Sequence, residues 1–179
     1  MKVLISAGHS NADPGAVIAG YTEAGIVTEL RNIVVKKLKE KGVDVISDGE
    51  GSVNLPLKDA MKLQDQAVID IELHCNASTN TQARGVESIG LPKDKALCQK
   101  LSKAIADVLI TAVRGDAGYI DQTKSARGKL GYVSKGGIIV ELFFLSNKTE
   151  LDSYNAKKWL VAEAIANVIA DHIKNGKIS

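Results

Sequence analysis

Apolar residues along the chain form short runs and helical stripes that alternate. Residues 2–7 are a short apolar run that Gly8 ends, which predicts a buried strand feeding a loop. Over residues 23–41 apolar positions recur at helical spacing between charges, and Gly42 follows, so we expect an amphipathic helix with a glycine stop. The same reasoning predicts strands at 43–46, 68–75, 85–91 and 138–144, helices at 56–67, 95–113 and 153–174, and a long loop at 114–135.

The alternation of strands and helices indicates the fold class. Strands that follow one another through helices pair in parallel by crossover connections. The 179 residues fit one domain, and no internal repeat is visible. We therefore expect a single α/β domain over residues 1–179, similar to phosphorylase and hydrolase folds. Its mostly parallel twisted sheet would have about six strands, with helices on both faces.

Composition and charge exclude several classes of protein. The chain carries 23 Lys and Arg against 21 Asp and Glu, and both signs are mixed along it, so no basic stripe for nucleic acid exists. No apolar stretch is long enough to cross a membrane. Cys75 and Cys98 could form at most one bridge, which a domain of this size does not need, and we expect two free thiols.

Two histidines are placed where predicted strands end. His9 follows the first strand, and His74 lies at the end of the strand at 68–75. Ligands of open α/β sheets bind outside the carboxyl ends of strands, so both positions suit chemistry. Alternation puts His74 on a polar face with Asp70 and Glu72, whereas Cys75 points to the other face and is expected in the core. An edge strand with one solvated face would explain the same pattern.

Glu141 interrupts the apolar strand at 138–144. A charged carboxylate in such a run costs several kcal/mol unless a cation, a metal or hydrogen bonds compensate it. A salt bridge would satisfy it, but burial also raises the pKa of a carboxylate toward the range of a general base. Glu141 is therefore a candidate for catalysis.

Histidines and carboxylates from separate strands suggest a catalytic zinc site, with three protein ligands and one open position. The HExxH signature is absent, so the ligands would have to converge in space. His9 and His74 are two candidates. Periodicity does not choose the third, which the residues leave open among Asp13, Glu23, Glu29 and Glu72.

Five segments, read in order, carry a family resemblance. They are GHSNADPGA, GYTEA at the start of a helix, ELHCNAS, RGVES and IIVELFFLSN. With this order and spacing the chain resembles the zinc-dependent N-acetylmuramoyl-L-alanine amidases of the amidase-3 type, which occur in bacterial autolysins and phage endolysins. The resemblance covers most of the chain.

The resemblance implies a role for several residues. The zinc ligands would be His9, Glu23 and His74, with Glu29 as a rival that fits the spacing to Gly42 less well. Glu141, which precedes FFLSN, matches the catalytic glutamate of the family.

The same resemblance gives expectations for three further residues. Asn76 in the second histidine motif and Arg114 in an Arg-Gly pair are expected to contact substrate, and Arg114 would bind peptide carboxylates. Glu72 departs from the form common in autolysins and is only a candidate for supporting a ligand.

The implied function is hydrolysis, with one Zn²⁺ per chain, of the amide between N-acetylmuramic acid and L-alanine in peptidoglycan. Glu141 would take a proton from water and return it to the leaving amine. The implied partner is the muramyl peptide of the wall, and the chain is expected to be a monomer without nucleic-acid or membrane partners. A zinc carboxypeptidase acting on wall peptides and a non-catalytic peptidoglycan-binding module are the alternatives.

The N-terminal segment also bears on location. Its apolar run is shorter than the core of a signal peptide. We expect a protein made in the cytoplasm that acts on the wall or periplasm after release, as in phage or prophage lysis. No segment resembles a wall-binding domain, so the whole chain is expected to be catalytic.

Overall fold

A six-stranded sheet forms the centre of the structure, a computed structural model that describes residues 1–126 and 128–176. The strand order is β4-β1-β5-β8-β6-β7. The strands are β1 (Lys2–Ala7), β4 (Asp44–Ser47), β5 (Ile69–Asn76), β6 (Glu87–Gly90), β7 (Tyr119–Asp121) and β8 (Ile138–Phe144).

The sheet is mostly parallel, as predicted. β1 pairs in parallel with β4 and β5, and β5 pairs in parallel with β8. β6 runs antiparallel to β8 and parallel to β7. A separate two-stranded hairpin, β2 (Val17–Ile18) and β3 (Tyr21–Thr22), precedes the first helix and was not predicted from the sequence.

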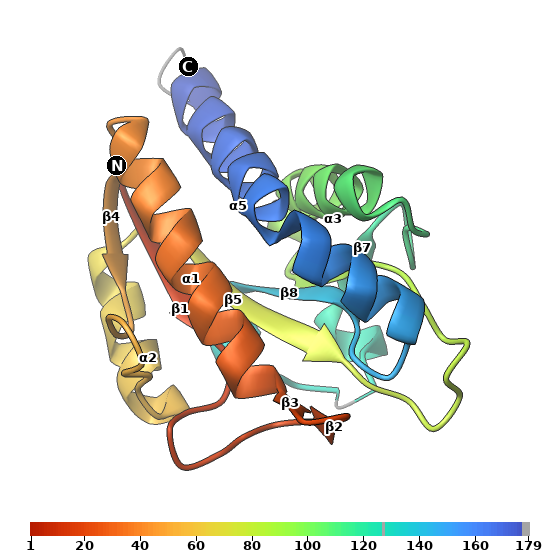
Figure 1. The fold of residues 1–179 in the computed structure, drawn as a ribbon. Coiled ribbons are helices and arrows are strands. Elements are labelled where there is room, and N and C mark those ends of the chain that lie inside the picture. The colour runs from red at the N-terminus through yellow and green to blue at the C-terminus, as the bar shows by residue number, and fades with distance from the viewer. Residues whose placement is uncertain (127, 177–179) are drawn as a thin grey trace.

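Helices cover both faces of the sheet, which confirms the predicted layers (Figure 1). The main core lies between the sheet and α1 (Glu23–Glu40), α3 (Lys95–Leu109) and α5 (Lys148–Gly176). A smaller apolar cluster on the opposite face includes Tyr132 and Val133 of α4 (Gly131–Ser134), and Met61 of α2 (Leu57–Leu63) packs against it.

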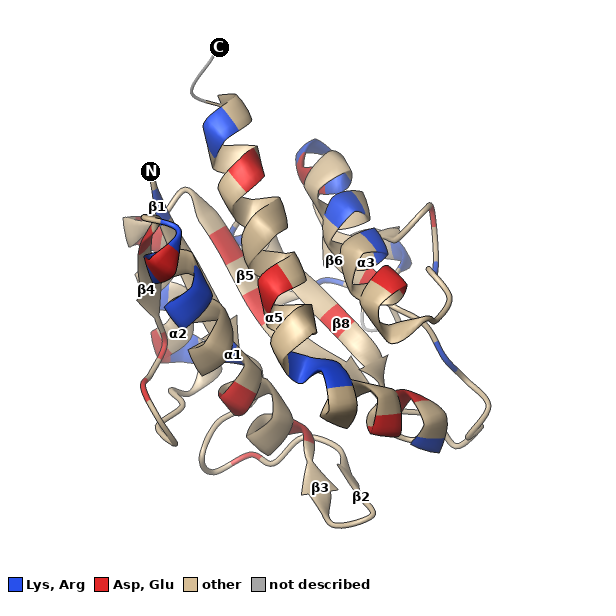
Figure 2. Ribbon diagram, turned by 45° about the horizontal axis from the view of Figure 1, so that its top comes forward, with Lys and Arg blue, Asp and Glu red and all other residues tan. Residues whose placement is uncertain are grey.

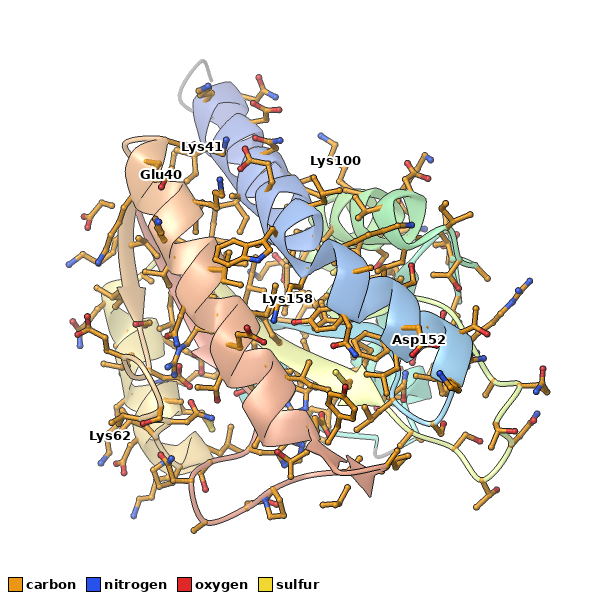
Figure 3. The ribbon with its side chains drawn as sticks, in the orientation of Figure 1. Glu40, Lys41, Lys62, Lys100, Asp152 and Lys158 are labelled. Carbon is orange, nitrogen blue, oxygen red and sulfur yellow. The ribbon has the colours of Figure 1, made fainter. Side chains whose placement is uncertain are left out.

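Ion pairs join α5 to α1 and to Lys41, the residue that caps the end of α1. Lys41 is 2.5 Å from Glu163, and Lys158 is 2.5 Å from Glu29 (both lysines are labelled in Figure 3). Exposed ion pairs contribute little, about 0 to 1 kcal/mol each. The apolar contacts beneath them therefore hold these two helices on the sheet.

Two expectations from composition agree with the structure. Cys75 and Cys98 are both buried free thiols. Within the described ranges, no helix is both long and apolar enough to cross a membrane.

Several predicted elements differ from those of the structure. The helix expected over 95–113 ends at Leu109, because Ile110 has a left-handed backbone with φ 58°. The segment 114–135, expected to be a loop, contains β7 and α4. The last helix begins at Lys148, before the expected residue 153.

β5 has an apolar face and an acidic face, as the alternation predicted, but it lies in the middle of the sheet and not at an edge. Ile69, Ile71, Leu73 and Cys75 belong to the main core. Asp70 and Glu72 point to the other face and are buried, with 9% and 4% exposure. Figure 2 shows acidic bands on the central strands β5 and β8. Acidic side chains are thus held inside the protein along β5.

Asp70→Asn should make the protein more stable at neutral pH. Burial raises the pKa of Asp70 to about 6, partly offset by a hydrogen bond from Gln64. Because the unfolded carboxyl titrates near about 4, the wild type loses stability as the pH rises from about 4 to about 6, and the loss persists above that range. The asparagine variant lacks this loss, so urea unfolding at pH 7.5 should show a gain of roughly 1 to 2 kcal/mol.

Asp44→Asn is the matched control, because Asp44 is an exposed residue at the start of the edge strand β4. The gain from Asp70→Asn should shrink as the pH is lowered toward 5, while the effect of the control should change little. A difference between Asp70→Asn and wild type that is the same at every pH would contradict this account.

Candidate active site

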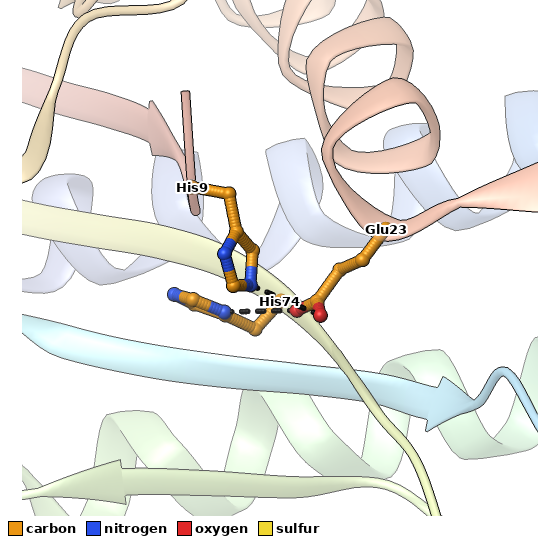
Figure 4. A group of neighbouring side chains, drawn as sticks. All are labelled: His9, Glu23 and His74. Carbon is orange, nitrogen blue, oxygen red and sulfur yellow. Dashed lines mark hydrogen bonds and ion pairs between the residues drawn. The ribbon is translucent and has the colours of Figure 1, made fainter. Parts of the chain in front are cut away.

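Three side chains from separate elements meet at one edge of the sheet. His9 follows β1, Glu23 begins α1, and His74 lies near the end of β5. Each offers one donor atom, and these atoms all lie within 4.8 Å of one another. Figure 4 shows both imidazole rings joined to the Glu23 carboxylate. The edge is the one formed by carboxyl ends of parallel strands, where α/β proteins bind ligands.

Glu23 is fixed by the start of α1. The Thr22 hydroxyl caps the helix by accepting a hydrogen bond from the Gly25 N–H at 3.1 Å, so Glu23 is the first helical residue. Its carboxylate accepts hydrogen bonds from the backbone N–H groups of Cys75 at 2.9 Å and Ala16 at 3.2 Å. Two backbone donors thus orient this carboxylate between the imidazoles.

His9 reaches the cluster from a strained backbone. Its φ is 67°, a left-handed conformation that is uncommon for residues other than glycine. Its Nε2 lies 3.0 Å from Glu23 Oε2. Gly15 leaves the space beside it, since a Cβ there would lie 2.6 Å from the His9 ring. The sharp turn after β1 therefore aims the ring at Glu23.

His74 projects from β5 beneath the turn that follows β1. Its Nδ1 is 2.9 Å from Glu23 Oε1. A Cβ on Gly8 would lie 2.3 Å from His74 Cε1, so only glycine lets the ring occupy this place. The glycine before His9 thus has a packing role in the site.

The three groups shift one another's pKa. Burial opposes ionisation of Glu23, but hydrogen bonds from His74 and His9 outweigh it and hold the pKa of Glu23 well below its usual range. The hydrogen bond to Glu23 raises the pKa of His9 against the effect of burial. Burial also opposes the charged form of His74, yet its bonds to Glu23 and Glu72 raise its pKa well above the usual value. Positive charge is therefore favoured here, which suits a cation.

Two further carboxylates hold the far sides of the imidazole rings. Asp13 Oδ2 is 3.0 Å from His9 Nδ1, and Glu72 Oε1 is 3.0 Å from His74 Nε2. Histidines that bind metals commonly donate their second N–H to a carboxylate, which fixes the ring and its tautomer. Asp13 and Glu72 occupy the places of such supporting groups.

Glu29, the remaining acidic candidate from the sequence, lies away from the cluster. It pairs with Lys158 of α5, and its side chain is 49% exposed. Among the four carboxylates that the sequence left open, the geometry therefore favours Glu23 as the one between the two rings.

Glu141 lies next to the cluster on the neighbouring strand. It is the register partner of His74, so both side chains point to the same face of the sheet. Its negative charge contributes to the raised pKa of His74. The register between β5 and β8 then shifts, and both Leu142 and Phe143 enter the main core. This irregularity keeps Glu141 on the site face while the next two residues pack inside.

Asn76 and Arg114, the two predicted substrate residues, both contact Glu87 of β6. Asn76 Nδ2 donates to Glu87 at 3.1 Å, and Arg114 Nε donates to it at 2.6 Å. The Arg114 guanidinium also lies over the Phe144 ring, 4.9 Å from its centre. Glu87 is the register partner of Glu141. The side chains of Asn76, Glu87 and Arg114 therefore continue the polar site across the sheet.

Glu87 was not assigned a role from the sequence. It stands in the RGVES segment, and the available signal was a carboxylate at the start of a predicted strand. Its partners are distant in the chain, so sequence spacing did not indicate their contact.

Solved structures similar to this one include amidases. The chain is 40% identical to a protein of Neisseria meningitidis provisionally described as an N-acetylmuramoyl-L-alanine amidase, with a TM-score of 0.90 over 97% of this chain and 96% of that one. The catalytic domain of CwlV, the amidase of Bacillus (Paenibacillus) polymyxa var. colistinus, matches with a TM-score of 0.81 over 97% and 98% of the two chains, and its 23% identity shows a shared fold. No curated protein sequence matches the chain.

The relative at 40% identity and a family match together define an amide hydrolase of peptidoglycan. The profile of one family, N-acetylmuramoyl-L-alanine amidase (Amidase_3), matches residues 3–171. The chain belongs to this family, and the resemblance noted in the sequence is confirmed.

Gly8→Ala should weaken divalent metal binding. The new methyl group would overlap the His74 ring and push it away from Glu23. We expect the zinc dissociation constant, measured by competition with a chromophoric chelator, to rise at least about 10-fold, as typically follows loss of ligand orientation.

Gly131→Ala is the matched control, because a Cβ there meets nothing closer than the Met61 sulfur at 3.5 Å. Unchanged zinc affinity in a folded Gly8→Ala protein would show that the position of the His74 ring does not matter for the metal.

Proposed function

We propose that the amidase activity of this chain depends on one zinc ion per chain, held by His9, Glu23 and His74. The observation that carries the proposal is the convergence of their donor atoms within 4.8 Å. Two imidazole nitrogens and one carboxylate oxygen are a ligand set of catalytic zinc sites, which keep a fourth position open. When bound, zinc supplies a Lewis acid that polarises the scissile carbonyl and makes water more acidic.

In this proposal Glu141 is the catalytic acid and base. Water attacks the carbonyl carbon of the amide that joins the lactyl group of N-acetylmuramic acid to L-alanine. The Glu141 carboxylate takes a proton from the attacking water and returns it to the amide nitrogen, so that the C–N bond breaks and L-alanine leaves as an amine. Support comes from the place of Glu141 beside His74 in the sheet register.

Arg114 and Asn76 are proposed to bind the stem peptide. A guanidinium presents several N–H donors in a plane that matches a carboxylate. Glu87 and the Phe144 ring hold Arg114 in place, while its side chain remains 42% exposed and accessible to a ligand. We propose that the enzyme acts as a monomer, with the whole described chain as its catalytic domain.

Glu141→Gln should bind zinc as the wild type does but lose turnover. The amide of glutamine cannot accept the proton of the attacking water, and general acid–base groups typically contribute about 100-fold or more to the rate. Release of soluble fragments from purified peptidoglycan measures turnover, and elemental analysis measures zinc.

Glu29→Gln is the matched control, since Glu29 pairs with Lys158 at the surface and is not part of the His9, Glu23 and His74 cluster. Full activity of Glu141→Gln would remove Glu141 from the reaction. Wild-type activity that survives complete removal of metal by a chelator would overturn the zinc proposal.

The masses of the released fragments distinguish the competing reactions. An amidase should release intact stem peptides that begin with a free L-alanine amine, together with glycan strands. A carboxypeptidase would shorten stem peptides from their carboxyl end and leave them on the glycan. A binding module would release neither product.

A further inference from the structure

The Asn54 side chain contacts the backbone that carries His9. Asn54 is 5% exposed and lies in the loop between β4 and α2. Its Nδ2 is 3.1 Å from the carbonyl oxygen of Ala7, 3.2 Å from that of Gly8 and 3.3 Å from that of His9. Three consecutive carbonyls thus converge on a single amide group.

This convergence matches the unusual backbone of His9. Left-handed residues other than glycine cost about 1 kcal/mol or more and persist only where their surroundings hold them. In this turn the carbonyl dipoles of residues 7–9 point toward one place, where they repel one another. An N–H₂ donor at that place compensates them. Asn54 therefore stabilises the turn that directs His9 toward Glu23.

A buried arginine fixes which way the Asn54 amide faces. Arg31 Nη1 donates to Asn54 Oδ1 and to Asp48 Oδ1, each at 3.0 Å. Because the amide oxygen faces this cation, the amide nitrogen must face the carbonyls. Arg31 and Asp48 have no exposed side-chain surface, so water does not compete for these bonds.

The same network also binds the last strand residue before the turn. Asp48 accepts hydrogen bonds from the Ala7 N–H, at 3.1 and 3.2 Å to its two oxygens. Asn54 binds the carbonyl of Ala7, so both polar groups of that residue are held. Beyond the turn, the Asn54 N–H donates to Asn11 Oδ1 at 2.7 Å. Hydrogen bonds therefore hold the turn on both sides of His9.

We propose that Asn54 is a positioning residue for the metal centre: it holds the turn at His9 in the conformation that presents Nε2 to the metal, and Arg31 sets its orientation. The inference rests on the proposed zinc site, which it deepens. Asn54 touches neither metal nor substrate, and it acts through the backbone of a ligand.

Asn54→Asp tests this inference, with Asn54→Ser as an uncharged variant in case the first does not fold. Asp replaces the N–H₂ donor by an oxygen that repels the three carbonyls, and Ser is too short to reach them all. For folded protein, checked by circular dichroism, we expect the zinc dissociation constant from chelator competition to rise about 10- to 100-fold, as for other groups that orient ligands.

Asn32→Asp is the matched control. Asn32 belongs to the same network, accepting from Arg31 at 3.0 Å and donating to the Gly51 carbonyl at 2.7 Å, but neither of these bonds involves residues 7–9. Its zinc affinity should remain within about 3-fold of wild type. Urea unfolding of the metal-free proteins measures the stability of each variant separately.

The outcomes separate the two proposals. Weaker zinc binding by both Asn54 variants, beyond the change in Asn32→Asp, supports the positioning role. Lower metal-free stability with wild-type zinc affinity would overturn it, because Asn54 would then only stabilise the fold. Absence of zinc binding by the wild type would overturn the proposed metal function, and the inference with it.

Discussion

The Glu23 carboxylate is the interaction on which the site depends. It is buried at the start of α1, and each of its oxygens faces one imidazole, at 2.9 Å for His74 and 3.0 Å for His9. The backbone N–H groups of Cys75 on β5 and of Ala16, just before β2, also donate to it. A buried carboxylate is costly unless cations and hydrogen bonds compensate it. Glu23 therefore links the start of the first helix to His9, which follows the first strand, and to His74 on the central strand.

Further contacts hold the side chains of the site in this arrangement. Carboxylates behind each imidazole fix its orientation, Gly8 provides the space for the His74 ring, and the buried Arg31 and Asn54 hold the turn at His9. Ligands held on strand ends and a helix start move less than ligands on a free loop. The strained backbone of His9 is a local cost that these contacts offset. The near balance of charge over the whole chain agrees with catalysis by a few placed residues.

Local patterns predict much of the fold and the centre of the site. β1 spans the predicted residues, and His74 was expected on the polar face of β5 because strand alternation is a local property. The three residues of β7 were missed, since their segment is polar and short and its pairing with β6 comes from distant residues. The helix end at Ile110 depends on a left-handed residue that helical periodicity does not reveal. Asn54 was missed because the carbonyls that its side chain contacts belong to residues 7–9, more than 40 positions away. Arg31 was missed as well, although a charged residue on the buried side of a helix is a signal that the sequence contains.

The central claim is that three residues, brought together by separate elements, are already placed to bind one zinc ion. Crystals grown with zinc, and diffraction data collected on both sides of the zinc absorption edge, test it directly. The account predicts one strong anomalous peak per chain, about 2 Å from His9 Nε2, His74 Nδ1 and a Glu23 oxygen, with these side chains close to their present positions. An anomalous map with no peak among these three side chains, or with the zinc bound elsewhere on the chain, would contradict it.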